Sequence, residues 1–177
     1  IKEDLPKYAY SSNPNGRCLQ LHGTRDSSAF SLFGEWLVQH SVPGYGTDYV
    51  VAPSKDFKGE YGIISCGDID KDEPVVSVPM ELAMTVSTAN EDPRLSFLVS
   101  KLKLNPTVVL ALHVITEKMK GEDSFWHPYV STLPSTFNIP MFWDWERLTS
   151  LANTSAFAAA RRSIISTASL FVNIVEA

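Results

Sequence analysis

The sequence contains little cysteine. Only Cys18 and Cys66 are present, far apart and outside any CxxC pattern. This spacing argues against a structural zinc site and against a disulfide scaffold, and it is typical of proteins from a reducing compartment. We therefore expect an intracellular protein of the cytoplasm, the nucleus or a plastid.

An excess of positive charge is also lacking, because 15 lysines and arginines stand against 20 aspartates and glutamates, a net charge of −5. Surfaces that bind nucleic acid or anionic membranes gather lysine and arginine, so neither partner is expected. No apolar run reaches the length of a membrane span, and no secretory signal pattern is visible. The sequence starts at Ile1 and stops at Ala177 within an apolar helical pattern, so we expect it to be a piece of a longer chain.

The chain does contain enough apolar material for one domain with a sizeable core, since 44% of its 177 residues are hydrophobic. Helical spacing of apolar residues and capping signals predict helices at 28–40, 90–99, 105–120, 144–148 and 152–175. Short runs rich in β-branched and aromatic residues predict strands at 49–52, 61–66 and 74–79.

Two patterns resemble metal sites but are incomplete. Residues 68–72 match the first ligand positions of a calcium-binding EF-hand loop, but Glu73 and Pro79 occupy the positions of its glycine and its chelating glutamate. We therefore expect a solvent-exposed acidic turn between two strands. His113 and Glu117 lie four residues apart on a helix, but no third ligand follows at a suitable spacing. A local surface pair is the better interpretation.

Residues 123–134 concentrate aromatic side chains and prolines. Pro128 and Pro134 fix φ and favour extended backbone in the residues before them. Considered alone, such a cluster is typical of a core corner after a helix. We expect Trp126 and Tyr129 to be mostly buried and to join the preceding helix to the strand layer.

The motif Ser-Phe-Trp-x-Pro-Tyr-x-x-x-Leu-Pro at 124–134, followed by an apolar-aromatic run at 138–143, resembles the SET-domain protein methyltransferases of the Rubisco large-subunit methyltransferase type. That group includes lysine methyltransferases and an actin-histidine methyltransferase branch. The likeness extends from about Trp36 to Leu151, which is most of the chain.

The resemblance implies an α+β fold, the N-terminal half of a SET domain followed by the start of a helical insert. It divides the chain into an N-terminal arm (1–27), the SET-domain part (28–143) and the first helices of the insert (144–177).

The resemblance also implies S-adenosylmethionine as the cofactor. The family carries a Gly-x-Gly turn before a strand, where the backbone bends around this ligand, and Gly62 matches the second glycine. The implied contacts come from Gly59, Glu60 and Tyr61, mainly through backbone groups, while Glu60 replaces the first glycine of the family. Arg25 is the nearest candidate for binding the cofactor's carboxylate. From the residues alone, a simple glycine-containing hairpin and a solvent-exposed arginine explain these positions better.

The implied activity is methyl transfer to a lysine or histidine nitrogen of a protein substrate, without a metal. In the family, an Asn-His stretch and a tyrosine near the transferred methyl group belong to the C-terminal half, and these 177 residues contain no Asn-His pair. No catalytic residue is therefore assigned, and we expect the chain alone to be inactive and poorly soluble. The alternative is a non-catalytic SET-like protein-interaction module, which Glu60 supports.

Overall fold

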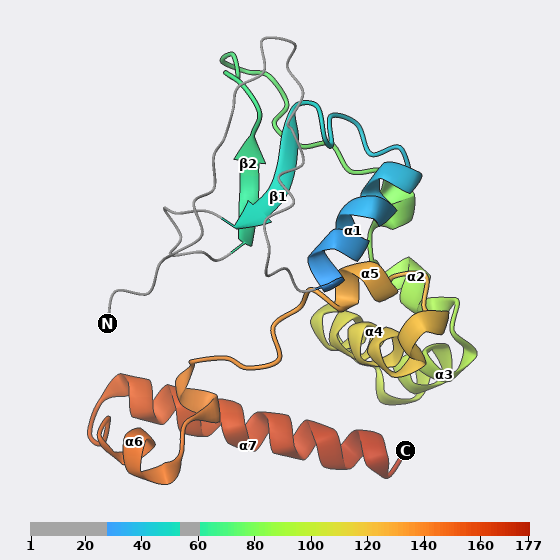
Figure 1. The fold of residues 1–177 in the computed structure, drawn as a ribbon. Coiled ribbons are helices and arrows are strands. Elements are labelled where there is room, and N and C mark those ends of the chain that lie inside the picture. The colour runs from blue at the N-terminus through green and yellow to red at the C-terminus, as the bar shows by residue number, and fades with distance from the viewer. Residues whose placement is uncertain (1–27, 54–60) are drawn as a thin grey trace. The chain divides into compact units, whose positions relative to one another are not determined.

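The computed structural model of the protein describes residues 28–53 and 61–177 (Figure 1). Seven helices, three short 3-10 helices and two strands make up these residues. In chain order they are α1 (Ser28–Gln39), β1 (Tyr49–Pro53), β2 (Tyr61–Ser65), η1 (Met80–Leu82), α2 (Val86–Asn90), α3 (Pro93–Leu102), α4 (Pro106–Lys120), η2 (Gly121–Asp123), α5 (His127–Val130), η3 (Pro140–Phe142), α6 (Trp145–Thr149) and α7 (Ser155–Val175). Helices together with a small antiparallel sheet confirm the predicted α+β class.

The described residues form two compact units, each with its own core. Of the described residues, the first contains 28–53, 61–83 and 117–132, and therefore α1, the β1–β2 hairpin and α5. The second contains residues 84–116 and 133–177, and α4 contributes residues to both. The three-part division expected from the sequence stays a prediction.

The sheet is one antiparallel hairpin, in which Tyr49 pairs with Ser65 and Pro53 pairs with Tyr61. Both strands match their predicted positions within one residue. The third predicted strand, at 74–79, is wrong, because this segment is irregular and its valines are exposed. Prolines at both of its ends remove two hydrogen-bond donors, and within the described residues no strand edge pairs with it.

The core of the first unit forms around the apolar face of α1. Trp36 and Leu37 pack with Val42, Tyr49 and Leu82, all of which are buried. The helical periodicity of the sequence predicted this face.

Helix α1 ends in a Schellman motif. Ser41 adopts the left-handed conformation with φ 51°, the amide of Val42 donates to the carbonyl of Leu37 over 3.1 Å, and the amide of Ser41 donates to that of Val38 over 3.0 Å. This pairing satisfies two carbonyls that the helix end leaves open, and it places Val42 beside Leu37 in the core.

Side-chain caps mark the start of two helices in the second unit. Asp92 accepts from the amide of Arg94 at the start of α3, and Asn105 accepts from the amide of Val108 over 3.1 Å at the start of α4. Both caps precede a proline in the first helical turn, an arrangement that the sequence predicted for Asn105 and Pro106. The core of this unit is formed by Ala89 of α2, Leu95 of α3 and Val109 of α4.

Helix α7 is the longest element, with 21 residues. Thr154 caps it by accepting from the amide of Phe157 over 3.2 Å. Several of its large apolar side chains are exposed, among them Ile165, Phe171 and Val175. None of the described helices combines the length and the apolar character that crossing a membrane requires.

Cys66, directly after β2, is disulfide-bonded. The expectation from cysteine spacing is therefore wrong on this point. Separation along a chain does not set separation in space, so the spacing of two cysteines cannot exclude a bond between residues that the fold brings together. The reducing compartment inferred from the same spacing stays a prediction.

A close approach between α1 and Tyr45 explains why Gly34 has no side chain. A Cβ atom at position 34 would lie 2.6 Å from the hydroxyl oxygen of Tyr45, well inside contact distance. The Tyr45 ring is held by an edge contact with Tyr49, at 5.7 Å between centroids, and its hydroxyl forms a hydrogen bond with the backbone of Val51. Burial raises the pKa of this phenol, so it stays neutral in the fold.

We expect Gly34→Ala to lower the free energy of unfolding in the native background, because a clash of about 1–3 kcal/mol outweighs the helix propensity of about 1 kcal/mol that alanine adds. In a Tyr45→Phe background the hydroxyl is absent, so the same substitution should be neutral or stabilising. Urea unfolding of the four variants measures this cycle. Equal effects of Gly34→Ala in both backgrounds would contradict the close contact.

Candidate functional site

The predicted cofactor turn leads into β2. Of its residues, Arg25, Gly59 and Glu60 lie outside the described part of the chain. Tyr61 is the first residue of β2, and Gly62 follows it in the strand, paired with Ala52 of β1. The structure therefore places the strand end of the predicted site, and the contacts assigned to the turn stay predictions.

The side chain of Tyr61 stacks on Phe30, in the first turn of α1. The two ring centroids are 3.6 Å apart and the ring planes differ by 5°. Because side chains alternate along a strand, Gly62 and its partner Ala52 face away from this stack. Two of the smallest residues thus lie side by side on the other face, where a ligand could approach the main chain closely.

A buried carboxylate holds the start of the aromatic motif. Glu117, with 3% of its surface exposed, accepts a hydrogen bond from the Ser124 hydroxyl over 2.6 Å and forms an ion pair with Lys120 at 2.6 Å. The Ser124 oxygen in turn accepts from the backbone amide of Trp126 over 3.1 Å. A buried charge requires such partners, so this network fixes the turn that presents Trp126.

Trp126 joins this turn to the core of the first unit. Its indole nitrogen donates to the carbonyl of Leu82 over 3.0 Å, and its ring packs against the core cluster that contains Tyr49 of β1. The predicted link between the motif and the strand layer is confirmed for Trp126, which is half-buried. Tyr129 lies nearer the surface, with 37% of its area exposed, and its ring contacts Phe33 of α1.

An aromatic layer connects α1 to the segment around α5, and Figure 1 shows these two helices side by side. Phe125 makes edge contacts with Trp36 and His40, at 5.5 and 5.3 Å between centroids. His40 also bonds through Nδ1 to the carbonyl of Trp36, at 2.8 Å. It is therefore a partly buried packing residue at the end of α1.

The backbone of the motif differs from the prediction. Pro128 was expected to keep His127 extended, but both residues lie in the first turn of α5. A proline is tolerated there, because an amide in the first turn of a helix has no partner within the helix. The short helix turns Tyr129 toward α1, so the proline starts a helix at this point.

The predicted surface pair of His113 and Glu117 is wrong, since both side chains are buried. Nε2 of His113 lies 3.1 Å from the hydroxyl of Thr88, whereas Glu117 bonds to Ser124 and Lys120. Helical spacing placed the two on one face, but it could not show which partners the fold would supply. The acidic turn at 68–72 is exposed, as expected.

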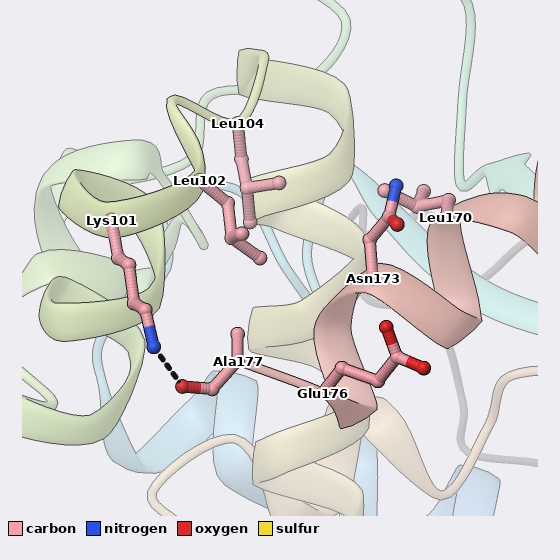
Figure 2. Close-up of a pocket in the computed structure, with 7 residues that line it drawn as sticks. All are labelled: Lys101, Leu102, Leu104, Leu170, Asn173, Glu176 and Ala177. Carbon is pink, nitrogen blue, oxygen red and sulfur yellow. Dashed lines mark hydrogen bonds between the residues drawn. The ribbon is translucent and has the colours of Figure 1, made fainter.

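The second unit contains a pocket of about 310 Å³, and Figure 2 shows its lining. Its walls are formed by Lys101, Leu102, Leu104, Leu170, Asn173, Glu176 and Ala177. Lys101 donates a hydrogen bond to the carbonyl of Ala177 across it.

Several known proteins are similar to this chain in sequence or in fold. No protein-family model matches this chain. A ribosomal lysine N-methyltransferase, set10 of Schizosaccharomyces pombe, is 32% identical over 111 residues, which cover 60% of this chain and 19% of the relative. The actin-histidine N-methyltransferase of Drosophila melanogaster is 29% identical over 130 residues, covering 73% and 23%. Both relatives are N-methyltransferases.

Solved SET structures share the fold. The structure of Rubisco LSMT bound to AdoMet (S-adenosylmethionine) superposes with a TM-score of 0.66 at 22% identity, covering 78% of this chain and 31% of that one. The SET domain of LSMT bound to methyl-lysine and AdoHcy gives a TM-score of 0.67. The chain thus has a SET-type fold, and it spans about a fifth of the length of the curated relatives it matches.

Phe30 is the residue at this site that sequence reasoning missed. Its helical spacing assigned it to the apolar face of α1, and nothing in that pattern indicated a partner in β2. A contact between residues 31 positions apart is set by the tertiary fold, which a periodicity argument does not contain.

We expect Trp126→Ala to lower the free energy of unfolding by about 3–5 kcal/mol, because it removes a large packed ring and leaves the Leu82 carbonyl without its donor. Trp126→Phe keeps much of the packing and should cost less, about 1–2 kcal/mol. Chemical denaturation measures both.

The matched control is Trp145→Ala, since Trp145 is 73% exposed and should change stability by less than about 0.5 kcal/mol. If Trp126→Ala were as mild as this control, Trp126 would not be the link described above.

Proposed function

We propose that this chain forms the N-terminal part of the SET domain of an S-adenosylmethionine-dependent protein methyltransferase. The observation that carries the proposal is sequence similarity to two protein methyltransferases, together with a fold shared with a SET structure bound to AdoMet. The motif around Trp126 supports it, because it is packed into the same unit as the strand end of the predicted cofactor site.

The proposed acceptor is a side-chain nitrogen of a protein. The names of the two relatives specify a lysine in one case and a histidine of actin in the other. Both nucleophiles react through a neutral nitrogen that must meet the methyl group in line with the departing sulfur, so catalysis depends mainly on positioning and on removal of a proton. We propose this shared chemistry, with lysine or histidine as the target.

The proposed cofactor site is the turn before β2. Backbone groups of Gly59, Glu60 and Tyr61 would contact S-adenosylmethionine, and Arg25 would pair with its carboxylate. The arrangement of β2 fits this placement in one respect. Gly62 and Ala52 lie side by side without large side chains, so a ligand can reach the main chain there.

We propose that the residues that remove the proton from the methylated nitrogen belong to other parts of the full-length protein. The relatives extend far beyond the region this chain covers, and the described residues contain no assigned proton acceptor. We therefore propose that the 177 residues alone do not transfer methyl groups. Transfer of a labelled methyl group by the isolated chain to any candidate protein would overturn this part.

We expect Gly62→Val to abolish binding of S-adenosylmethionine to the full-length protein, because a branched side chain would fill the space beside the main chain. Glu60→Gly should bind equally well or better, since it removes a carboxylate that would repel the carboxylate of the cofactor. Calorimetric titration with S-adenosylmethionine measures both affinities.

The control is Gly67→Ala, because a Cβ atom at position 67 would meet no atom within 4 Å. Native affinity in this variant shows that a small side chain elsewhere near the hairpin is tolerated. Native affinity in Gly62→Val as well would place the cofactor elsewhere, and it would favour a non-catalytic protein-interaction module.

A further inference from the structure

Helix α7 carries an apolar stripe that faces solvent. Spacings of three and four residues place a set of apolar side chains on one side of this helix. Phe171 and Val175 have 66% and 67% of their surfaces exposed. An exposed apolar face on a long helix indicates a surface that another helix can cover. The stripe, in which every member is exposed, consists of Ile164, Ile165, Ala168, Phe171, Val172 and Val175.

Other parts of α7 pack within the second unit. Near the start of the helix Ala160 is buried and Phe157 is partly buried, and η3 packs against α7. Leu170 and Asn173 line the pocket of this unit (Figure 2). At about 100° per residue, these two side chains point away from the centre of the stripe. Because the residues of the stripe are exposed, no described residue of the unit covers it.

Opposite charges border the stripe at its two ends. Arg161 and Arg162 precede it, Glu176 follows it, and the sequence between them contains no charged residue. All three side chains are exposed, and none of them forms an ion pair with another residue that the structure describes. The stripe is therefore an uncharged apolar surface with a positive end and a negative end.

We propose that α7 pairs through this stripe with α7 of a second copy of the chain, in antiparallel orientation. A two-fold axis near Ala168 places Ile164 of one copy opposite Val172 of the other, and the small alanine lets the helices approach closely. The same axis brings Arg161 of each copy beside Glu176 of the other. A parallel pair would instead bring like charges together at both ends, which disfavours it.

The length of the stripe sets the strength expected of this dimer. From Ile164 to Val175 the helix rises about 17 Å, at about 1.5 Å per residue. Burial of the apolar side chains drives association, and the two charge pairs select the antiparallel orientation. Since stable interfaces usually bury more surface than one such stripe offers, we expect a dissociation constant on the order of 1–100 µM.

Sedimentation equilibrium of the full-length protein, without added cofactor, measures this association. We expect Phe171→Ser to weaken it at least about tenfold, because each dimer loses two rings from its interface. Arg161→Glu and Glu176→Arg should each weaken it about three- to tenfold, since each creates like-charge contacts at both ends. The double variant that carries both charge reversals should associate with near-native affinity. Only the antiparallel orientation combines weakening in both single variants with recovery in the double variant.

The matched controls carry the same kinds of change outside the stripe. Met119→Ser removes a side chain of α4 that is 83% exposed, and Lys118→Glu reverses an exposed charge beside it. Neither should change the dissociation constant of the dimer. Circular dichroism of each variant shows whether it is folded, and the substituted side chains of α7 are exposed in one copy, so their loss should leave its fold intact.

Three results would overturn the inference. The first is a full-length protein that stays monomeric up to about 1 mM, because the stripe is then covered by another segment of the same polypeptide or by a different partner. The second is a dimer that Phe171→Ser leaves intact. The third is a double charge-reversal variant that associates no better than the single variants. If Phe171→Ser does not fold, the charge variants still decide. The proposed function does not enter any of these outcomes, because association is measured without S-adenosylmethionine.

Discussion

The buried carboxylate of Glu117 is the constraint on which the first unit depends. A carboxylate with 3% exposure is costly unless its oxygens are bonded, and here Ser124 and Lys120 supply the bonds. Because the Ser124 oxygen also receives the amide of Trp126, the charge that must be satisfied determines the path of the chain into the aromatic motif. The core of tryptophan, leucine and tyrosine side chains closes over that path. The apolar packing of this unit and the polar network around Glu117 therefore depend on each other through Trp126.

Local signals in the sequence predicted most helices of this fold. Asn105 followed by Pro106 marked the start of α4, and Gly121, with φ 59°, follows its last residue. Such signals act over three or four residues, so they work without knowledge of the rest of the fold. The segment at 74–79 shows the limit of local reasoning. It has the composition of a strand, but strand formation requires a neighbouring edge, and composition does not provide one.

The candidate site was predictable only in part, because sequence patterns act locally and contacts between distant residues are set by the tertiary fold. Resemblance of the motif pointed to the turn before β2, and the structure places Tyr61 at the start of that strand. The partners of the site residues could not be read from the sequence. The stacking of Phe30 on Tyr61 and the burial of His113 against Thr88 both join residues far apart in the chain. Pattern analysis finds the residues with suitable chemistry, and tertiary structure decides what they touch.

The irregular segment at 74–79 also bears on how this chain behaves at high concentration. Val75, Val76 and Val78 are exposed, with 52%, 37% and 54% of their surfaces accessible, and their β-branched side chains favour pairing with a strand from another molecule. Pro74 and Pro79 border the valines, and an acidic turn precedes them. Prolines interrupt intermolecular ladders and like charges repel, so these neighbours act as gatekeepers against aggregation. The residues that prevent a third strand within the molecule thus also oppose sheet formation between molecules.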